Sequence, residues 1–239
     1  LAEITSTTTE LNVLDGVTAT TAELNIMDGV TSSATELNLL DGVTALASSV
    51  NGLSDAMLEN TSMYIGNDPS STTSEAYGNL AIGTTALNAV TTGDNNTAVG
   101  YNALTANTTG HQNTAIGYST LSSNTEGNYN TAVGDSSLVD NSTGNYNSAL
   151  GYRALYANTG SRNTAMGYLA LADATSASAN TAVGHQALRF NTTGSWNLGI
   201  GHQALYNNDT GSANTAIGSG VLAFNNSGDN NTGIGTSAL

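Results

Sequence analysis

Aromatic and imidazole side chains recur at a regular spacing in this chain, each directly after the glycine of a repeated pair such as "IG". They are Tyr101, Tyr118, Tyr152, Tyr168, His185 and His202. If that position faces outward, the rings form a stripe of flat apolar faces on which the sugar rings of a surface receptor could stack. A surface column that only covers turn backbone explains the same spacing, and both interpretations stay open.

His185 and His202 lie one repeat apart, so their rings are expected to stack. Threefold symmetry between chains would bring such histidines to an axis, and imidazole suits Zn²⁺ or Ni²⁺. Two histidine substitutions in a tyrosine column are the simpler explanation. Asp15, Asp28 and Asp41 each precede a glycine and could line a cation path in a trimer, but solvation accounts for them equally well. We therefore predict no metal site and no cofactor.

Nothing in the sequence assembles the groups that catalysis needs. No set of nucleophile, base and orienting residue stands apart from the repeats, and the glycine pairs lack the lysine of a phosphate-binding loop. We expect no enzymatic activity. Glycosylation sequons, for example at Asn107 and Asn191, arise by chance in a chain so rich in Asn and Thr.

The composition narrows the range of partners. The net charge is −15, from 18 acidic residues and three arginines, and only 9% of the residues are charged. Nucleic acid and anionic membrane surfaces both require clustered Lys or Arg, so neither is an expected partner. The chain has no cysteine, which excludes disulfides and thiolate metal sites. No apolar run is long enough to span a bilayer, and we predict no membrane insertion.

Residues 1–50 contain a 13-residue repeat, "TELNVLDGVTATT" in its first full copy. In each copy a hydroxyl residue precedes a glutamate by three positions, which is the spacing of a helix capping box, and a glycine follows where the helix would end. Each unit therefore predicts about two turns of helix with one narrow apolar stripe. Helices this short need packing, so we predict a stalk of several chains, with three as the favoured number.

A 17-residue repeat fills residues 67–239, with 51–66 as a junction in which Met63, Tyr64 and Ile65 resemble a degenerate first copy. One spacing, between Gly151 and Gly167, is 16 residues long, and the missing residue falls in a turn. Four residues before the anchoring glycine there is always an asparagine. These asparagines are Asn79, Asn96, Asn113, Asn130, Asn147, Asn163, Asn180, Asn197, Asn214 and Asn231.

Further columns complete the repeat: an aliphatic residue or Met precedes the glycine, Ala or Gly comes one position earlier, and a leucine follows four positions later. Short strand-like pieces, "TAIGY" and then "AL", separated by turns, predict a mainly β fold, a parallel β-solenoid or β-roll with one 17-residue rung per turn. Equal columns would then stack. We expect a dry aliphatic column, a dry leucine column and a ladder of bonded asparagine amides, with association of chains burying more of a thin core.

The pattern "NTAIGY.AL" with "NTTG" resembles the head repeats of trimeric autotransporter adhesins, whose repeats are typically shorter. The units "TELN.LDGVTA" look like repeats of phage tail-fibre-type proteins. The first resemblance implies a left-handed parallel β-roll in a three-chain bundle. Both imply attachment at the surface of a virus or a cell.

We therefore predict a segment of a homotrimeric fibre, outside the cell or on a virion, that projects a surface and touches a receptor glycan. One alternative is a subunit of a self-assembling extracellular filament, joined end to end through the solenoid. Another is an ice- or crystal-binding solenoid that uses Thr columns such as Thr97, Thr114 and Thr131. The substitutions at Ser148 and Leu198 interrupt that column and count against ice binding.

Overall fold

A computed structural model describes residues 56–59, 61–66 and 75–238 of the chain. The 13-residue repeats and the predicted helical stalk of residues 1–50 lie outside these residues, as do the aspartates Asp15, Asp28 and Asp41. The described part consists of one sheet with short strands and contains no helix. The strands are β1 (Ala56–Glu59), β2 (Ser62–Ile65), β3 (Leu80–Ile82), β4 (Thr97–Val99), β5 (Thr114–Ile116), β6 (Thr131–Val133), β7 (Ser148–Leu150), β8 (Thr164–Met166), β9 (Thr181–Val183), β10 (Leu198–Ile200), β11 (Thr215–Ile217) and β12 (Thr232–Ile234).

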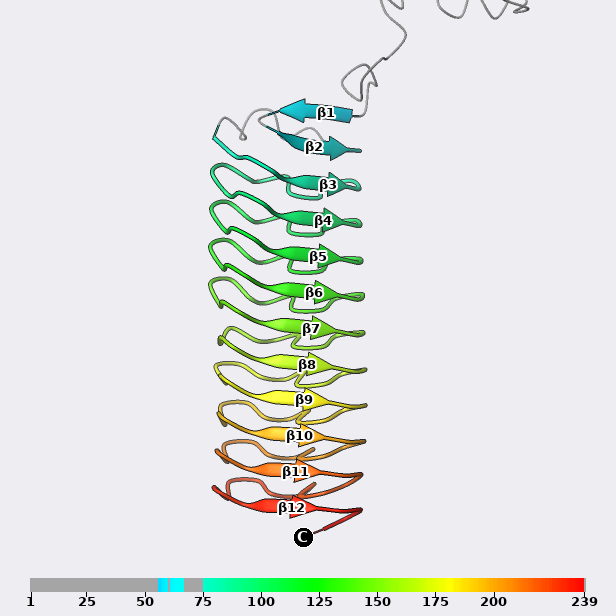
Figure 1. Ribbon diagram of the computed structural model, residues 1–239, viewed down its shortest axis with the longest axis vertical. Coiled ribbons are helices and arrows are strands. Elements are labelled where there is room, and N and C mark those ends of the chain that lie inside the picture. The colour runs from blue at the N-terminus through cyan, green and yellow to red at the C-terminus, as the bar shows by residue number, and fades with distance from the viewer. Residues whose placement is uncertain (1–55, 60, 67–74, 239) are drawn as a thin grey trace, which may run out of the picture. The chain divides into compact units, whose positions relative to one another are not determined.

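The strands stack in chain order, each beside its sequence neighbour (Figure 1). β1 runs antiparallel to β2, and the eleven strands from β2 to β12 are parallel. The chain therefore coils as a β-solenoid of about ten turns, which confirms the parallel β-solenoid of the prediction. The vertical register is also as predicted, because Ile116 pairs with Val99 on one side and with Val133 on the other.

The first and the shortened turns keep the register. Met63 pairs with Leu80 and Ile65 with Ile82, so the degenerate copy recognised in the sequence forms a strand of the same sheet. The strands on either side of the 16-residue spacing remain aligned, with Ser148 opposite Thr164. The deletion is absorbed between the strands, where no sheet pairing is lost.

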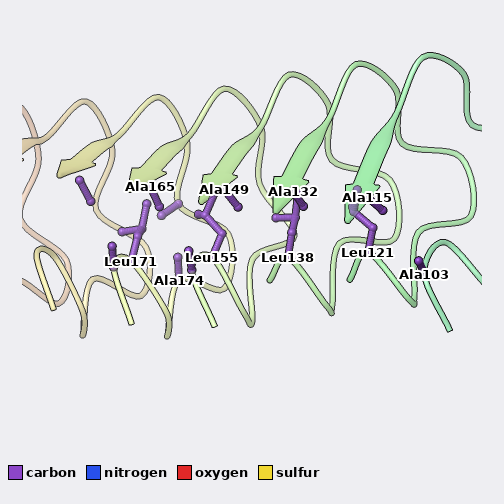
Figure 2. Packing of buried hydrophobic residues seen from close by; sticks show 14 of the residues in the cluster. Ala103, Ala115, Leu121, Ala132, Leu138, Ala149, Leu155, Ala165, Leu171 and Ala174 are labelled. Carbon is purple, nitrogen blue, oxygen red and sulfur yellow. The ribbon is translucent and has the colours of Figure 1, made fainter. Parts of the chain in front are cut away.

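The core is built from alanine and leucine. The strand alanines, for example Ala115 and Ala132, and the leucines that follow, for example Leu121 and Leu138, are all fully buried. Figure 2 shows the two columns inside the coil, alanine below the strands and leucine opposite. Full burial of each leucine stabilises the fold by roughly 1.5–3 kcal/mol.

The expected dry column of aliphatic residues is wrong for the single chain. Ile116 is 41% exposed and Leu150 is 48% exposed, so this column lies on the outside of the sheet. Strand side chains alternate between faces. Once the alanine of each strand points inward, the residues on either side of it must point outward, and the narrow coil has room inside only for the small side chain.

The "AL" piece of the repeat is a turn, and the expectation of a second strand there is wrong. Leu104 has φ of 50° and Asn102 has φ of 57°, which is the left-handed region that interrupts a strand. The turn still joins its neighbour, because the Leu104 backbone N–H donates to the Thr120 carbonyl at 3.0 Å. Layering therefore continues outside the strands without regular sheet geometry.

The anchoring glycine is required for two reasons. Gly134 has φ of 131°, a conformation that L side chains rarely adopt. A Cβ at this position would lie 2.6 Å from the carbonyl oxygen of Gly151 in the next turn. The close approach of successive turns therefore demands glycine after each strand from β3 to β11.

We expect Ala213→Gly to raise the free energy of unfolding by about 1 kcal/mol, because Ala213 has φ of 57° and glycine adopts that conformation without strain. Ala106→Gly is the matched control. Ala106 is not among the residues with positive φ, so the same substitution should lower stability there by about 0.5–1 kcal/mol. Denaturant midpoints of the two variants check the opposite signs, and equal shifts would contradict the conformational argument.

Candidate functional site

The asparagine column before each strand forms a continuous ladder inside the coil. The Asn113 backbone N–H donates to the Asn96 side-chain oxygen at 2.9 Å, and the Asn113 amide nitrogen donates to the Gly127 carbonyl at 2.7 Å. Each asparagine from Asn96 to Asn214 thus bonds through its backbone N–H to the turn before it and through its side chain to the turn after it. Backbone or side-chain bonds of the same kind join Asn79, Asn96, Asn113, Asn130, Asn147, Asn163, Asn180, Asn197, Asn214 and Asn231.

A second asparagine ladder, not recognised in the sequence, runs beside the first. The Asn124 amide nitrogen donates to the Asn107 side-chain oxygen at 2.7 Å and to the Gly127 carbonyl at 3.1 Å. The sequence signal was an asparagine three residues before the second glycine of most repeats. Asn107 and Asn191 belong to this ladder and are fully buried, so their sequons present no accessible amide in the folded chain.

The second ladder is coupled to the glycine column. A Cβ at Gly144 would lie 2.2 Å from the Asn141 side-chain oxygen and 2.3 Å from the Gly160 carbonyl oxygen. Where Ala177 replaces the glycine of this column, Ala174 stands three residues earlier in place of the asparagine. The shorter side chain removes one of the two clashes, which explains why the two substitutions occur in the same turn.

A third polar ladder lies on the surface, and its members differ in type. Each accepts a hydrogen bond from the backbone N–H of its counterpart one turn earlier; His111, for example, accepts at Nδ1 from Asp94 N–H at 3.0 Å. These side chains share a hydrogen-bond acceptor atom close to the backbone. A search for identical residues at one repeat position does not detect this property. The accepting side chains are Asp94, His111, Asn128, Asn145, Ser161, Ser178, Ser195, Ser212 and Asp229.

The predicted aromatic stripe is present as stacked rings. Tyr101 stacks on Tyr118 with centroids 5.5 Å apart, and Tyr152 stacks on Tyr168 at 5.4 Å. Asp135 takes the position between Tyr118 and Tyr152 and divides the stripe. Stacked rings cover one another's faces and turn their edges to solvent. The geometry therefore favours a surface column over a platform for sugar rings at these positions.

The histidines continue this column. His185 lies 5.1 Å from the Tyr168 ring and 5.2 Å from His202, in both cases with nearly parallel planes. Within the described part of the chain, no three His, Asp or Glu side chains come together in a group that could hold a metal ion. In one chain the two imidazoles thus act as members of the aromatic stack.

A second aromatic column, which the sequence analysis missed, stands two residues before the strands. Tyr129 stacks on Tyr146 at 5.0 Å. Trp196 occupies the same position farther along and is 72% exposed. Its counterparts in the adjacent turns are Ala179 and Ala213, which have no ring to stack on it. Trp196 therefore differs from the tyrosines in keeping its indole faces free of neighbouring rings of the column.

The outward side chains of β3–β12 form an outer sheet face with two columns, one mostly Thr and one aliphatic. A shallow hollow of about 220 Å³ lies on this face around Ser148, lined also by Val133, Leu150, Thr164 and Met166. The smaller hydroxyl residue at 148 and the longer side chains at 150 and 166 explain the unevenness.

The described turns are held together largely by their own side chains. Their polar side chains bond mainly to the neighbouring turns, and the ion pair between Asp173 and Arg189, at 3.9 Å, lies on the surface. None of the described residues belongs to a helix of the length and apolarity needed to span a bilayer. The chain matched no protein family, no curated protein and no solved structure.

Removal of one side-chain amide from the inner asparagine ladder should lower the stability of the fold. In Asn130→Ala the backbone N–H of Asn147 and the carbonyl of Gly144 lose a buried partner, so we expect a loss of about 2–4 kcal/mol in the free energy of unfolding. The exposed Asn88→Ala is the matched control and should change stability by less than about 0.5 kcal/mol. Equal losses in urea titrations would contradict the structural role of the ladder.

The coupling between the glycine and asparagine columns can be measured in a double-mutant cycle. Gly144→Ala should destabilise the chain strongly, and it should cost less in an Asn141→Ala background because the clash with that side chain is gone. We expect a coupling energy of about 1–3 kcal/mol in unfolding measurements. Strict additivity of the two changes would show that Ala174 and Ala177 occur together for another reason.

Proposed function

We propose that this chain is a structural segment of a homotrimeric attachment fibre, located outside the cell or on a virion, and that it holds a binding surface away from the body that carries it. The observation that carries the proposal is the unbroken bonding between turns. From β2 to β12, each strand pairs in parallel with the next, and the turns outside the strands bond to the same neighbours. Such a coil resists bending and shear more than a fold held by a few contacts.

The chemistry of the ladders supports a role outside the controlled conditions of a cell. The inner ladders consist of neutral amides, which do not titrate, and the chain contains no cysteine whose redox state would matter. Ion pairs, which salt screens, contribute little. Cohesion of this kind is therefore insensitive to pH, ionic strength and redox potential.

Trp196 supports an adhesive role alongside the mechanical one. It is the only tryptophan in the chain, and its side chain is 72% exposed. An exposed indole without stacked neighbours is suited to pack against the apolar face of a sugar ring.

The fibre is tested by mass photometry together with electron micrographs of the purified chain. We expect a species of three times the 24.1 kDa chain mass and short rods of one length. A monomer would overturn the homotrimer. Endless rods would favour the filament alternative, and thermal hysteresis in freezing assays would favour ice binding.

The adhesive part is tested on a glycan array, followed by fluorescence titration with the oligosaccharides that bind. Because the chain has a single tryptophan, its emission reports on Trp196 alone. We expect saturable changes in emission and loss of array binding in Trp196→Ala, with binding retained in the control Tyr146→Ala. Array binding that survives Trp196→Ala would place the glycan elsewhere, and an array without hits would contradict glycan recognition.

A further inference from the structure

One of the two columns on the outer sheet face of β3–β12 is apolar and continuous. Ile82 is 39% exposed, Met166 is 46% exposed and Ile217 is 37% exposed, and the same column is aliphatic in every turn between them. Its members are Ile82, Val99, Ile116, Val133, Leu150, Met166, Val183, Ile200, Ile217 and Ile234. Soluble proteins seldom leave so long an apolar patch uncovered, and large patches of this kind mark interaction sites.

The second column of this face is uncharged as well. It consists of Leu80, Thr97, Thr114, Thr131, Ser148, Thr164, Thr181, Leu198, Thr215 and Thr232. Neither column contains an acidic or basic residue, although the chain has 18 acids and a net charge of −15. Two copies that meet at any surface with acidic residues would bring like charges together, whereas at this face they would not.

The size of the face suits a specific interface. Two columns over ten turns supply 20 outward side chains per chain. A stable interface typically uses about 20–30 residues and buries about 800 Å² on each partner. The match favours a partner that runs along the whole length of the coil, and a second copy of this chain has the same length and the same repeat.

We infer that the outer sheet face is the interface between copies of this chain, which pack side by side with their coils parallel. The inference rests on the proposed fibre and names the surface that joins its chains. In equal register the aliphatic side chains of one turn meet those of the same turn in the partner copies. The hollow at Ser148 then receives longer side chains from a neighbouring copy, and the dry column expected from the sequence forms between chains.

Two properties of the strands agree with this arrangement. The strands are only three residues long, so the face is narrow and leaves both of its edges, with the aromatic columns, outside the contact. The inward-facing alanines let the coil stay thin, so the chain itself cannot cover its aliphatic column. Burial of that column stabilises the association by about 25 cal/mol for each Å² of apolar surface removed from water.

Short-arm cross-linking tests the interface in the full chain, which has no cysteine of its own. Ile116→Cys places a thiol on the face, and Thr109→Cys places one on an exposed turn seven residues away as the control. A bismaleimide of about 8 Å reach adds one thiol across each of its two C=C bonds, without an oxidant. We expect Ile116→Cys to cross-link at least tenfold faster than Thr109→Cys at micromolar protein.

A second variant separates the interface from other contacts between chains. Adding Val133→Lys and Ile200→Lys to Ile116→Cys introduces charge on the face and should abolish the cross-linking, while the far-ultraviolet spectrum and the denaturant midpoint remain those of a folded coil. Adding Ser123→Lys and Thr193→Lys, at exposed turn positions outside the sheet, should leave cross-linking unchanged.

The outcomes distinguish this inference from the proposed function. Cross-linking that is equal at both cysteines, or that survives the face lysines, would overturn the interface even if mass photometry finds a trimer. A wild-type dimer that cross-links only through the face would support the interface and contradict the trimer. A monomer without cross-links would overturn both.

Discussion

The structure depends on vertical register, in which every turn bonds to the next at an offset of one repeat. Backbone groups at the strands and at the turns donate to equivalent groups in the adjacent turn, as between Leu104 and Thr120. The inner asparagines extend this bonding into the interior, where an unpaired amide would be costly. Each turn of the coil has the same backbone shape and the same neighbours as the turn before it. A residue type that fits at one position of a turn therefore fits at the equivalent position of the other turns, and this is why the sequence repeats.

Register also dictates where large side chains can lie. Strand alanines and turn leucines fill the inside, and glycines such as Gly134 allow the close approach of one turn to the next. The aliphatic residues of the strands are left outside, where they are unfavourable in water unless another surface covers them. A thin coil with an apolar column on its outer face is thus well suited to assembly into a bundle of several chains, which links the fold to the proposed fibre.

Much of the architecture could be predicted from the columns. The parallel solenoid, the pairing of Ile116 with Val99 and Val133, and the early copy at Met63–Ile65 follow from spacing alone. The candidate surfaces were harder to predict. The polar ladder from Asp94 to Asp229 uses side chains of four types, and the column of Trp196 mixes aromatic, polar and small residues. Neither column therefore shows one repeated residue type.

The sequence by itself determined the period, the stacking of equal residues and the positions that only glycine can fill, because these depend on distance along the chain. The tertiary structure decided which columns face inward. That choice depends on the space inside a closed turn, which admits the alanine of "TAI" and the leucine beyond it and leaves the isoleucine outside. The pattern of hydrophobic residues does not predict the size of that space, because the space forms only when the chain closes into a turn.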